Sequence, residues 1–254
     1  MSDFPFPETV EEFRIAREAV EERIADAARR AGRDPGEVRL LPVSKTWPAE
    51  RLRLAIAAGM TTLGENRIQE LSAKARELAD TGVRWCVIGH LQRNKARDCA
   101  AWADEFHALD SVRVGAALQR RLEAVDRHLD VFIQVNTSLE PQKHGLAADE
   151  VAGVLAGLAD FDRLRVRGLM TLAEFSRDET VVRPCFARLR ELRERLIPGL
   201  PDGMNLDELS MGMSGDFEWA IEEGATTVRV GQAIFGARAT KDSEYWPGQG
   251  RENH

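Results

Sequence analysis

The chain has 254 residues, of which 43% are hydrophobic and 30% charged, a composition typical of globular proteins. Its formal net charge of −7 argues against a nucleic-acid surface as the main function. No apolar run approaches the roughly 20 residues that span a bilayer, and the N-terminus lacks the pattern of a secretory signal. Three widely spaced cysteines without a CxxC motif suit a reducing compartment. We therefore expect a cytoplasmic protein without a membrane or nucleic-acid partner.

The first predicted element is a helix over residues 8–30, in which apolar residues recur at intervals of three and four. Thr9 and Glu12 have the spacing of a capping box, and Gly32 suits the end of the helix. Short apolar runs then alternate with helical patterns. The predicted strands cover residues 40–44, 61–64, 85–89, 106–109, 131–136, 164–170, 208–211 and 227–230. The predicted helices between them cover residues 49–58, 67–79, 92–102, 111–126, 149–159, 179–196 and 215–223.

Eight strands that alternate with helices predict a single (β/α)8 barrel, with the N-terminal helix as an addition. The alternative is an open, doubly wound sheet. Because no GxGxxG turn follows the first strand, the dinucleotide-binding form of that alternative is disfavoured. We expect the barrel to comprise residues 8–238 and the polar ends, residues 1–7 and 239–254, to be flexible.

Lys45 stands where the first strand passes into its helix, at the edge where parallel α/β folds bind ligands. A lysine there can hold a carbonyl compound as a Schiff base if its surroundings lower its pKa. Taken alone, a lysine at a strand end is more often simply exposed. The other strand ends therefore decide how Lys45 is interpreted.

The last two strands end in small and hydroxyl residues, among them Ser210, Gly212 and Gly231, which suit a phosphate. Each of them alone also suits a turn or a helix cap. Strands one and eight are neighbours in a closed barrel, so a lysine and a phosphate site would meet there. Pyridoxal 5′-phosphate (PLP) combines an aldehyde with a phosphate. Arg229 could face its pyridine nitrogen or form a salt bridge instead, and the five histidines show no spacing that predicts a metal site.

Several segments resemble the pyridoxal phosphate homeostasis proteins: VSKT at 43–46, LGENRIQE at 63–70, IGHLQRNK at 88–95, QVNTSLEPQKHG at 134–145, GLM at 168–170, and the long segment at 209–238. The resemblance implies a barrel like the N-terminal domain of alanine racemase. It also implies roles in PLP binding: Lys45 would form the Schiff base, Arg229 would face the pyridine nitrogen, Ser210 with the backbone of Gly231 and Gln232 would hold the phosphate, and Asn66 and Met211 would line the pocket. Arg67 and Gly215 depart from the residues usual in that family, and Arg67 would alter the rim of the pocket.

The resemblance implies a protein without clear catalytic activity that acts in vitamin B6 balance. The alternative is a PLP-dependent amino-acid racemase, which needs a second acid or base opposite the lysine. In alanine racemases that group is a tyrosine of a second domain, whereas the only tyrosine here is Tyr245, in the polar tail. We therefore expect a carrier or buffer with no catalytic residue. It would serve PLP-dependent apoenzymes and be a monomer, since it lacks the second domain through which racemases dimerise.

Overall fold

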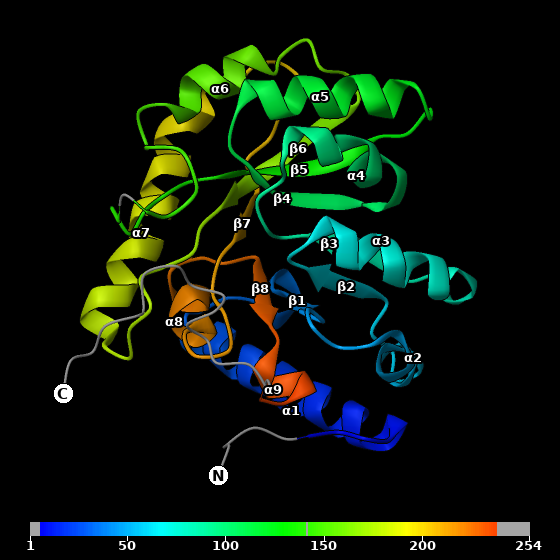
Figure 1. Ribbon diagram of the computed structural model, residues 1–254. Helices are drawn as coiled ribbons and strands as arrows, with labels where there is room; N and C mark the ends of the chain where they lie inside the picture. Colours follow the sequence, from blue (N-terminus) through cyan, green and yellow to red (C-terminus); the bar gives the residue numbers. More distant parts are fainter. Residues whose placement is uncertain (1–5, 141, 238–254) are drawn as a thin grey trace, which may run out of the picture.

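The structure is a computed structural model that describes residues 6–140 and 142–237 (Figure 1). The tail predicted to be flexible, residues 239–254, lies outside the described residues, as do residues 1–5 of the N-terminal segment. Phe6 is described, and its ring packs edge-on against Trp47 with 5.6 Å between the ring centroids. The flexibility of both ends and the exact limits of the domain stay predictions.

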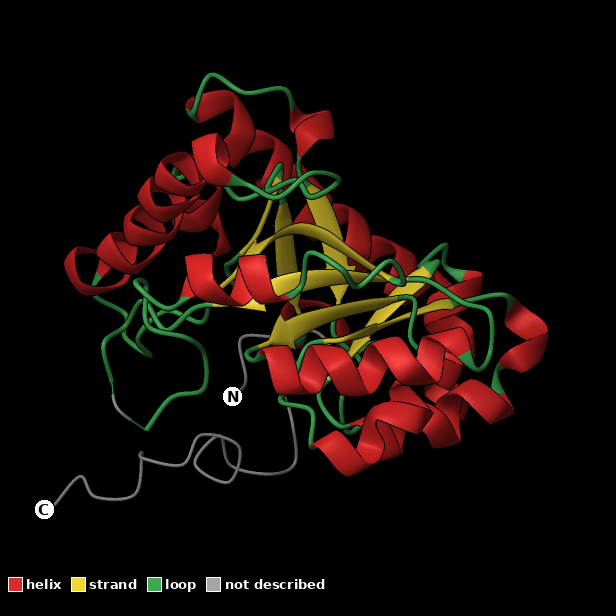
Figure 2. Ribbon diagram, turned by 90° about the horizontal axis from the view of Figure 1, so that it is seen from above, coloured by secondary structure: helices red, strands yellow, loops and turns green. Residues whose placement is uncertain are grey.

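Eight strands of the described chain form one parallel sheet, in the order β1-β8-β7-β6-β5-β4-β3-β2. A parallel bridge between Val43 and Gly64 joins the continuation of β1 to β2 and closes the ring, with helices around it (Figure 2). The (β/α)8 barrel is confirmed, and the open sheet is excluded. The strands are β1 Arg39–Pro42, β2 Thr62–Glu65, β3 Arg84–Val87, β4 Glu105–Leu109, β5 Leu129–Gln134, β6 Leu164–Met170, β7 Glu208–Ser210 and β8 Thr227–Val230.

The helices follow the predicted positions, with shorter ends. α4 and α6 begin later than predicted and have no side-chain cap, and a 3₁₀ turn, η3, precedes α4. α7 has the predicted bounds because the Asp178 side chain caps it. The elements are α1 Val10–Arg30, η1 Pro35–Glu37, α2 Ala49–Ala57, α3 Ile68–Glu77, η2 Ala79–Thr81, η3 Arg93–Lys95, α4 Ala96–Trp102, α5 Val112–Glu123, α6 Val151–Gly157, α7 Glu179–Leu196, η4 Ile197–Gly199, α8 Phe217–Glu222 and α9 Gln232–Phe235.

The additional helix α1 has the predicted capping box, in which the side chains of Thr9 and Glu12 each accept a backbone N–H of the other residue. It lies against α8 and α9 at the last β/α units (Figure 1). The Phe13 ring meets the Phe235 ring edge-on at 5.5 Å, and Arg23 donates to Glu218 at 2.9 Å. α1 therefore braces the end of the chain that carries β8.

The core has two layers, because the strands pack against side chains inside the ring and against the helices outside it. The apolar stripe of α7 shows the outer layer, where Val182, Phe186, Leu189 and Leu192 are buried against the sheet. No helix among the described residues is long and apolar enough to cross a membrane. The carboxyl ends of all eight strands open at one mouth, where the predicted site residues lie.

Candidate functional site

Lys45 lies just beyond the carboxyl end of β1, at the mouth of the barrel. The Val43 N–H donates to the carbonyl of Val230 at 2.9 Å, and the Ser44 N–H donates to the carbonyl of Gly64 at 2.9 Å. The two residues before Lys45 are thus tied to β8 on one side and to β2 on the other. Lys45 itself is half-buried.

The backbone around Lys45 forms a tight, strained turn. The Trp47 N–H donates back to the carbonyl of Ser44 at 3.2 Å. Thr46 has a φ of 71°, a left-handed conformation that β-branched residues rarely adopt. Strain of this kind is concentrated at functional sites, where the surrounding structure holds it.

A buried ion pair supports this turn from below. Lys74 Nζ donates to Glu65 Oε1 at 2.7 Å and to the carbonyl of Ser44 at 3.0 Å, and the Ser44 hydroxyl donates to the same carboxylate oxygen at 2.6 Å. Burial raises the pKa of Glu65, while the Lys74 charge opposes that rise. The backbone before Lys45 is therefore fixed by side chains of β2 and α3.

Asn66 directly follows β2, and a close approach to Gly89 holds it in place. A Cβ atom at position 89 would lie 2.1 Å from the Asn66 carbonyl oxygen and 2.6 Å from its side-chain Oδ1. Only glycine fits at this position without moving Asn66. Asn66 is half-buried at the mouth, on the β2 side of Lys45.

The loop after β7 meets the end of β8 on the other side of Lys45. Gly212 has a φ of 92°, and a Cβ there would lie 2.7 Å from the Cβ of Ala220. The Gly231 N–H donates to the Ser214 hydroxyl oxygen at 3.2 Å, which brings the two loops together. A Cβ at position 231 would lie 3.2 Å from the Val43 carbonyl, so this pair also adjoins the Lys45 segment.

The two remaining predicted residues of these loops differ in burial. Met211 is fully buried, and its N–H donates to the Thr227 carbonyl at 3.1 Å. Gln232 is half-buried and begins the short helix α9. Gln232 therefore stands at the surface of the mouth, whereas Met211 belongs to the packing beneath it.

Arg229 of β8 is almost completely buried, with 3% of its surface exposed. Its Nη1 donates to the Ser210 hydroxyl at 2.7 Å, and its Nη2 donates to the Thr171 carbonyl at 2.7 Å. Within the described part of the chain it has no ion-pair partner, so the salt bridge considered as an alternative is not present there. Burial lowers the pKa of Arg229 to about 10, so the guanidinium keeps its charge at pH 7.

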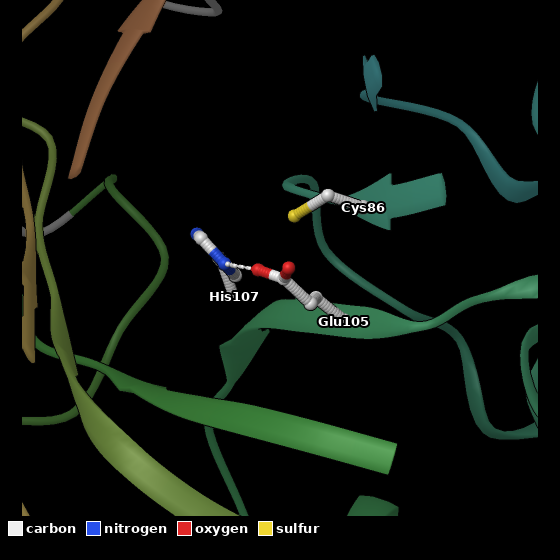
Figure 3. A group of neighbouring side chains, drawn as sticks. All are labelled: Cys86, Glu105 and His107. Atoms are coloured by element: carbon white, nitrogen blue, oxygen red, sulfur yellow. Dashed lines mark hydrogen bonds and ion pairs between the residues drawn. The ribbon is translucent and has the colours of Figure 1, made fainter. Parts of the chain in front are cut away.

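A chain of hydrogen bonds runs from Arg229 through the barrel interior. The Ser210 hydroxyl lies 2.9 Å from His107 Nδ1, and His107 Nε2 lies 3.0 Å from Glu105 Oε2 (Figure 3). Glu105 accepts two hydrogen bonds from Arg39, at 2.6 and 2.7 Å. Arg39 begins β1 at the opposite end of the barrel, so the chain connects the floor with the mouth.

The charges fix the direction of these hydrogen bonds. Burial would raise the pKa of Glu105, but hydrogen bonds from His107 and Arg39 outweigh it and hold that pKa well below its usual range. Burial lowers the pKa of His107 to about 4, so its ring is neutral at pH 7. Nε2 therefore carries the hydrogen that Glu105 accepts, and Nδ1 accepts the Ser210 hydroxyl hydrogen. The Ser210 oxygen is then free to accept from Arg229.

Two clusters of described residues have the composition of a metal site, but their geometry does not suit one. In the first, His107 and Glu105 already bind each other, and burial raises the pKa of the adjacent Cys86 thiol well above its usual value (Figure 3). In the second, the rings of His90 and His144 stack 4.4 Å apart and only 9° from parallel. Ring lone pairs lie in the ring plane, so stacked rings cannot both point at one ion.

The structure brings most of the sequence-predicted residues together around one mouth, and it adds others. Lys45, Gly231 and Gln232 adjoin at the β1–β8 seam, and Asn66 flanks it. The predicted site residues do not include Thr171, which accepts from Arg229, or Ser214, which accepts from Gly231. They also do not include His107 and Glu105, which are linked to Arg229 through Ser210. A signal for two of them was present, because Glu105 and His107 are polar residues two apart in an apolar strand and so share its inner face.

The chain is similar to known proteins over most of its length. A family model described as the N-terminal domain of alanine racemase matches residues 15–239. A pyridoxal phosphate homeostasis protein of Pseudomonas aeruginosa is 44% identical over 216 residues, which cover 85% of this chain and 91% of that protein. The protein of the same name in Escherichia coli K12 is 41% identical over 226 residues, which cover 86% and 94%.

Solved structures agree with these sequence comparisons. The structure of PipY from Synechococcus elongatus with PLP bound is 37% identical, with a TM-score of 0.74, and covers 85% of this chain and 100% of that chain. Alanine racemase from Corynebacterium glutamicum, at 19% identity and a TM-score of 0.58, covers 87% of this chain and 61% of that chain, and shares the fold alone. The chain thus belongs to the pyridoxal phosphate homeostasis protein family, whose barrel is that of the alanine racemase N-terminal domain.

Proposed function

We propose that the protein binds PLP at the barrel mouth, between the ends of β1, β7 and β8, and acts as a carrier or buffer in vitamin B6 homeostasis. The observation that carries this proposal is the seam where β8 meets β1. There a buried, charged Arg229, which has no carboxylate partner among the described residues, stands two residues before Gly231, which adjoins the Lys45 turn. The relatives' names and the PLP bound to PipY support the same cofactor.

The residues at this seam fit PLP at three points. Bound PLP supplies an aldehyde for covalent attachment to a lysine, an aromatic ring and a phosphate. Lys45 is the lysine at the seam, and Arg229 is the group for the ring nitrogen. A guanidinium cannot accept a proton, so facing Arg229 keeps that nitrogen unprotonated and weakens the ring as an electron sink. This arrangement suits holding the cofactor more than using it.

Phosphate binding falls to the pair of loops at Ser214 and Gly231. The Ser214 oxygen accepts the Gly231 N–H, so its own hydrogen is available for a phosphate oxygen. Gln232 adds a neighbouring backbone N–H, Asn66 forms the wall on the β2 side, and the fully buried Met211 packs beneath the site. The family resemblance instead implies that Ser210 holds the phosphate, and that role stays a prediction. Its hydroxyl is committed to Arg229 and His107, so we assign Ser210 to positioning Arg229.

The test combines an absorption spectrum with chemical trapping. Purified protein supplied with PLP should show the absorption band of a lysine-bound cofactor, and borohydride reduction should fix the cofactor on the peptide that contains Lys45. Lys45→Ala should lose both the band and the adduct, whereas Lys95→Ala, a half-buried lysine on η3, should keep both. A reduced adduct on another lysine, or a protein that stays colourless, would contradict the proposal.

A racemase is the competing activity, and turnover distinguishes it from a carrier. Racemisation needs an acid or base opposite Lys45, in addition to Lys45 itself. We expect no accumulation of D-amino acid when the PLP-loaded protein is incubated with common L-amino acids. Multiple turnovers that Lys45→Ala abolishes would replace the carrier with a racemase.

We further infer that the protein is a cytoplasmic monomer that supplies PLP to apoenzymes. The free cysteines of the described chain, Cys86, Cys99 and Cys185, are all buried, which suits a reducing compartment. Light scattering on the PLP-loaded protein tests the monomer, and a mass of twice the 28.3 kDa chain would contradict it. Activation of a PLP-dependent apoenzyme by the loaded protein, faster than by free PLP at the same concentration, tests delivery.

A further inference from the structure

A groove lined by arginines leads away from the barrel mouth along the outside of the molecule. It consists of two hollows, of about 230 and 530 Å³, which adjoin because Arg93 of η3 and Arg113 of α5 line both. Arg120 and Arg121 also line the larger hollow, whose lining includes no acidic residue. We call Arg93, Arg113, Arg120 and Arg121 the arginine groove.

The four arginines have no charge partner in the part of the chain that the structure describes. Across residues 6–140 and 142–237 none of them forms an ion pair or a side-chain hydrogen bond. The acids nearest along the chain are engaged elsewhere, since Asp110 binds His90 and Glu123 accepts from Gln119. Exposed arginines on other faces do have partners, such as Arg53 with Asp80 at 2.8 Å. The groove therefore concentrates positive charge on a protein whose net charge is −7.

This arrangement costs stability in the free protein. Arg113 lies in the first turn of α5, at the positive end of the helix dipole, and that turn contains no acidic residue. Arg120 follows Arg113 by seven positions, which places it two turns further along the same face of the helix, and Arg121 lines the same hollow. Three like charges beside one hollow repel one another. A bound anion would offset both the unfavourable position of Arg113 in the helix dipole and the repulsion among the arginines.

The shape of the groove selects the kind of anion. From Arg113 to Arg121 the helix rises about 12 Å, which exceeds the reach of one phosphate or carboxylate. A guanidinium group binds a carboxylate through two parallel N–H groups, so four arginines along the groove suit a run of acidic side chains. The negative charge of the rest of the protein disfavours nucleic acid.

The position of the groove links it to the mouth. The smaller hollow is lined by His90, which follows β3, and by Asp110 and Ser111, which follow β4. These residues stand at the carboxyl ends of their strands, on the same side of the barrel as Lys45. A molecule held by the arginines thus lies next to the opening through which PLP would enter and leave.

We propose that the arginine groove docks an acidic segment of a partner protein beside the barrel mouth. The choice of a protein partner rests on the proposed function, because an apoenzyme that receives PLP must come to that mouth. Docking by charge also suits a brief encounter, since it speeds association more than it slows release.

The test uses a fluorescent octaglutamate peptide and the full-length protein, with and without added PLP. Binding is followed by anisotropy, and the absorption band of bound PLP is recorded on the same samples. The double variant Arg113→Glu/Arg120→Glu should bind the peptide at least about tenfold more weakly, as expected for removal of complementary charges. The matched control Arg177→Glu/Arg195→Glu changes the net charge equally at two exposed, unpaired arginines elsewhere, and should bind as the unchanged protein does.

Two other outcomes overturn the docking proposal, and a third concerns the proposed function alone. Equal losses in the two double variants would show a general charge effect and no docking groove. Tighter binding of an octanucleotide than of the peptide would replace the protein partner with nucleic acid. Failure of the unchanged protein to take up PLP would contradict the proposed function alone, because peptide binding is measured separately.

Discussion

The two sides of the barrel mouth hold their charged groups in opposite ways. On the side of β7, β8 and β1, Arg229 is buried and donates to Ser210 and to the Thr171 carbonyl, and a chain of partners continues to the floor of the barrel. On the side of β3 and β4, Arg93 and Arg113 are exposed and have no partner among the described residues. Burial with pairing fixes geometry, as a small rigid cofactor requires. Exposure without pairing leaves long side chains free to adapt to a larger partner.

The largest expected effect of this difference is on stability. Glu105→Gln removes the buried charge that Arg39 and His107 share, so the free energy of unfolding should fall by about 3–5 kcal/mol. Arg113→Gln, on the exposed side, should cause no loss, because it relieves repulsion within α5. Urea unfolding of both variants measures the contrast. Equal losses in the two variants would abolish the distinction between the two sides.

The next effect is a dependence of stability on pH. The pKa of His107 is lowered to about 4 in the folded protein, whereas in the unfolded chain it is near 6.5, so the unfolded state binds more protons between these values. Stability should therefore fall as the pH drops from about 6.5 towards 4, by up to about 3 kcal/mol from this residue. Urea unfolding at a series of pH values should show a shallower acid limb in His107→Asn. An unchanged slope would mean that His107 is not held neutral by burial.

The smallest effect concerns the phosphate loops. Ser214→Ala removes the hydroxyl that joins Gly231 and is assigned to the phosphate, so PLP affinity should fall about tenfold, as for the loss of one hydrogen bond to a charged group. The absorption band of the bound cofactor should keep its position, since Arg229 is untouched. Ser210→Ala removes the hydroxyl that accepts from Arg229, so it should shift the absorption band. A band that shifts in Ser214→Ala and not in Ser210→Ala would reverse the two assignments.

The barrel and the seam at Lys45 were predictable because they depend on local patterns. Alternating strands and helices specify the fold, and parallel strands place their carboxyl ends together, which directs attention to Lys45 and Arg229. Register and depth within the barrel were not predictable. Ser210 contacts His107 of β4 across the barrel interior, and the two residues are 103 positions apart in sequence. Contacts of this kind decide whether Ser210 faces a phosphate or lies beneath Arg229. The partners of Arg229 were not predictable for the same reason: among the described residues they are a hydroxyl and a carbonyl, not the carboxylate considered as an alternative.

The hydrogen-bond chain from Arg39 to Arg229 connects the floor of the barrel with the proposed PLP site at its mouth. If Arg229 faces the cofactor, the absorption wavelength of bound PLP should respond to changes at Arg39, Glu105 and His107, none of which lies at the mouth. Substitutions on the floor can then be ranked by a wavelength as well as by a denaturation curve. The spectrum of the bound cofactor would thus report whether the hydrogen-bond chain in the barrel interior is intact.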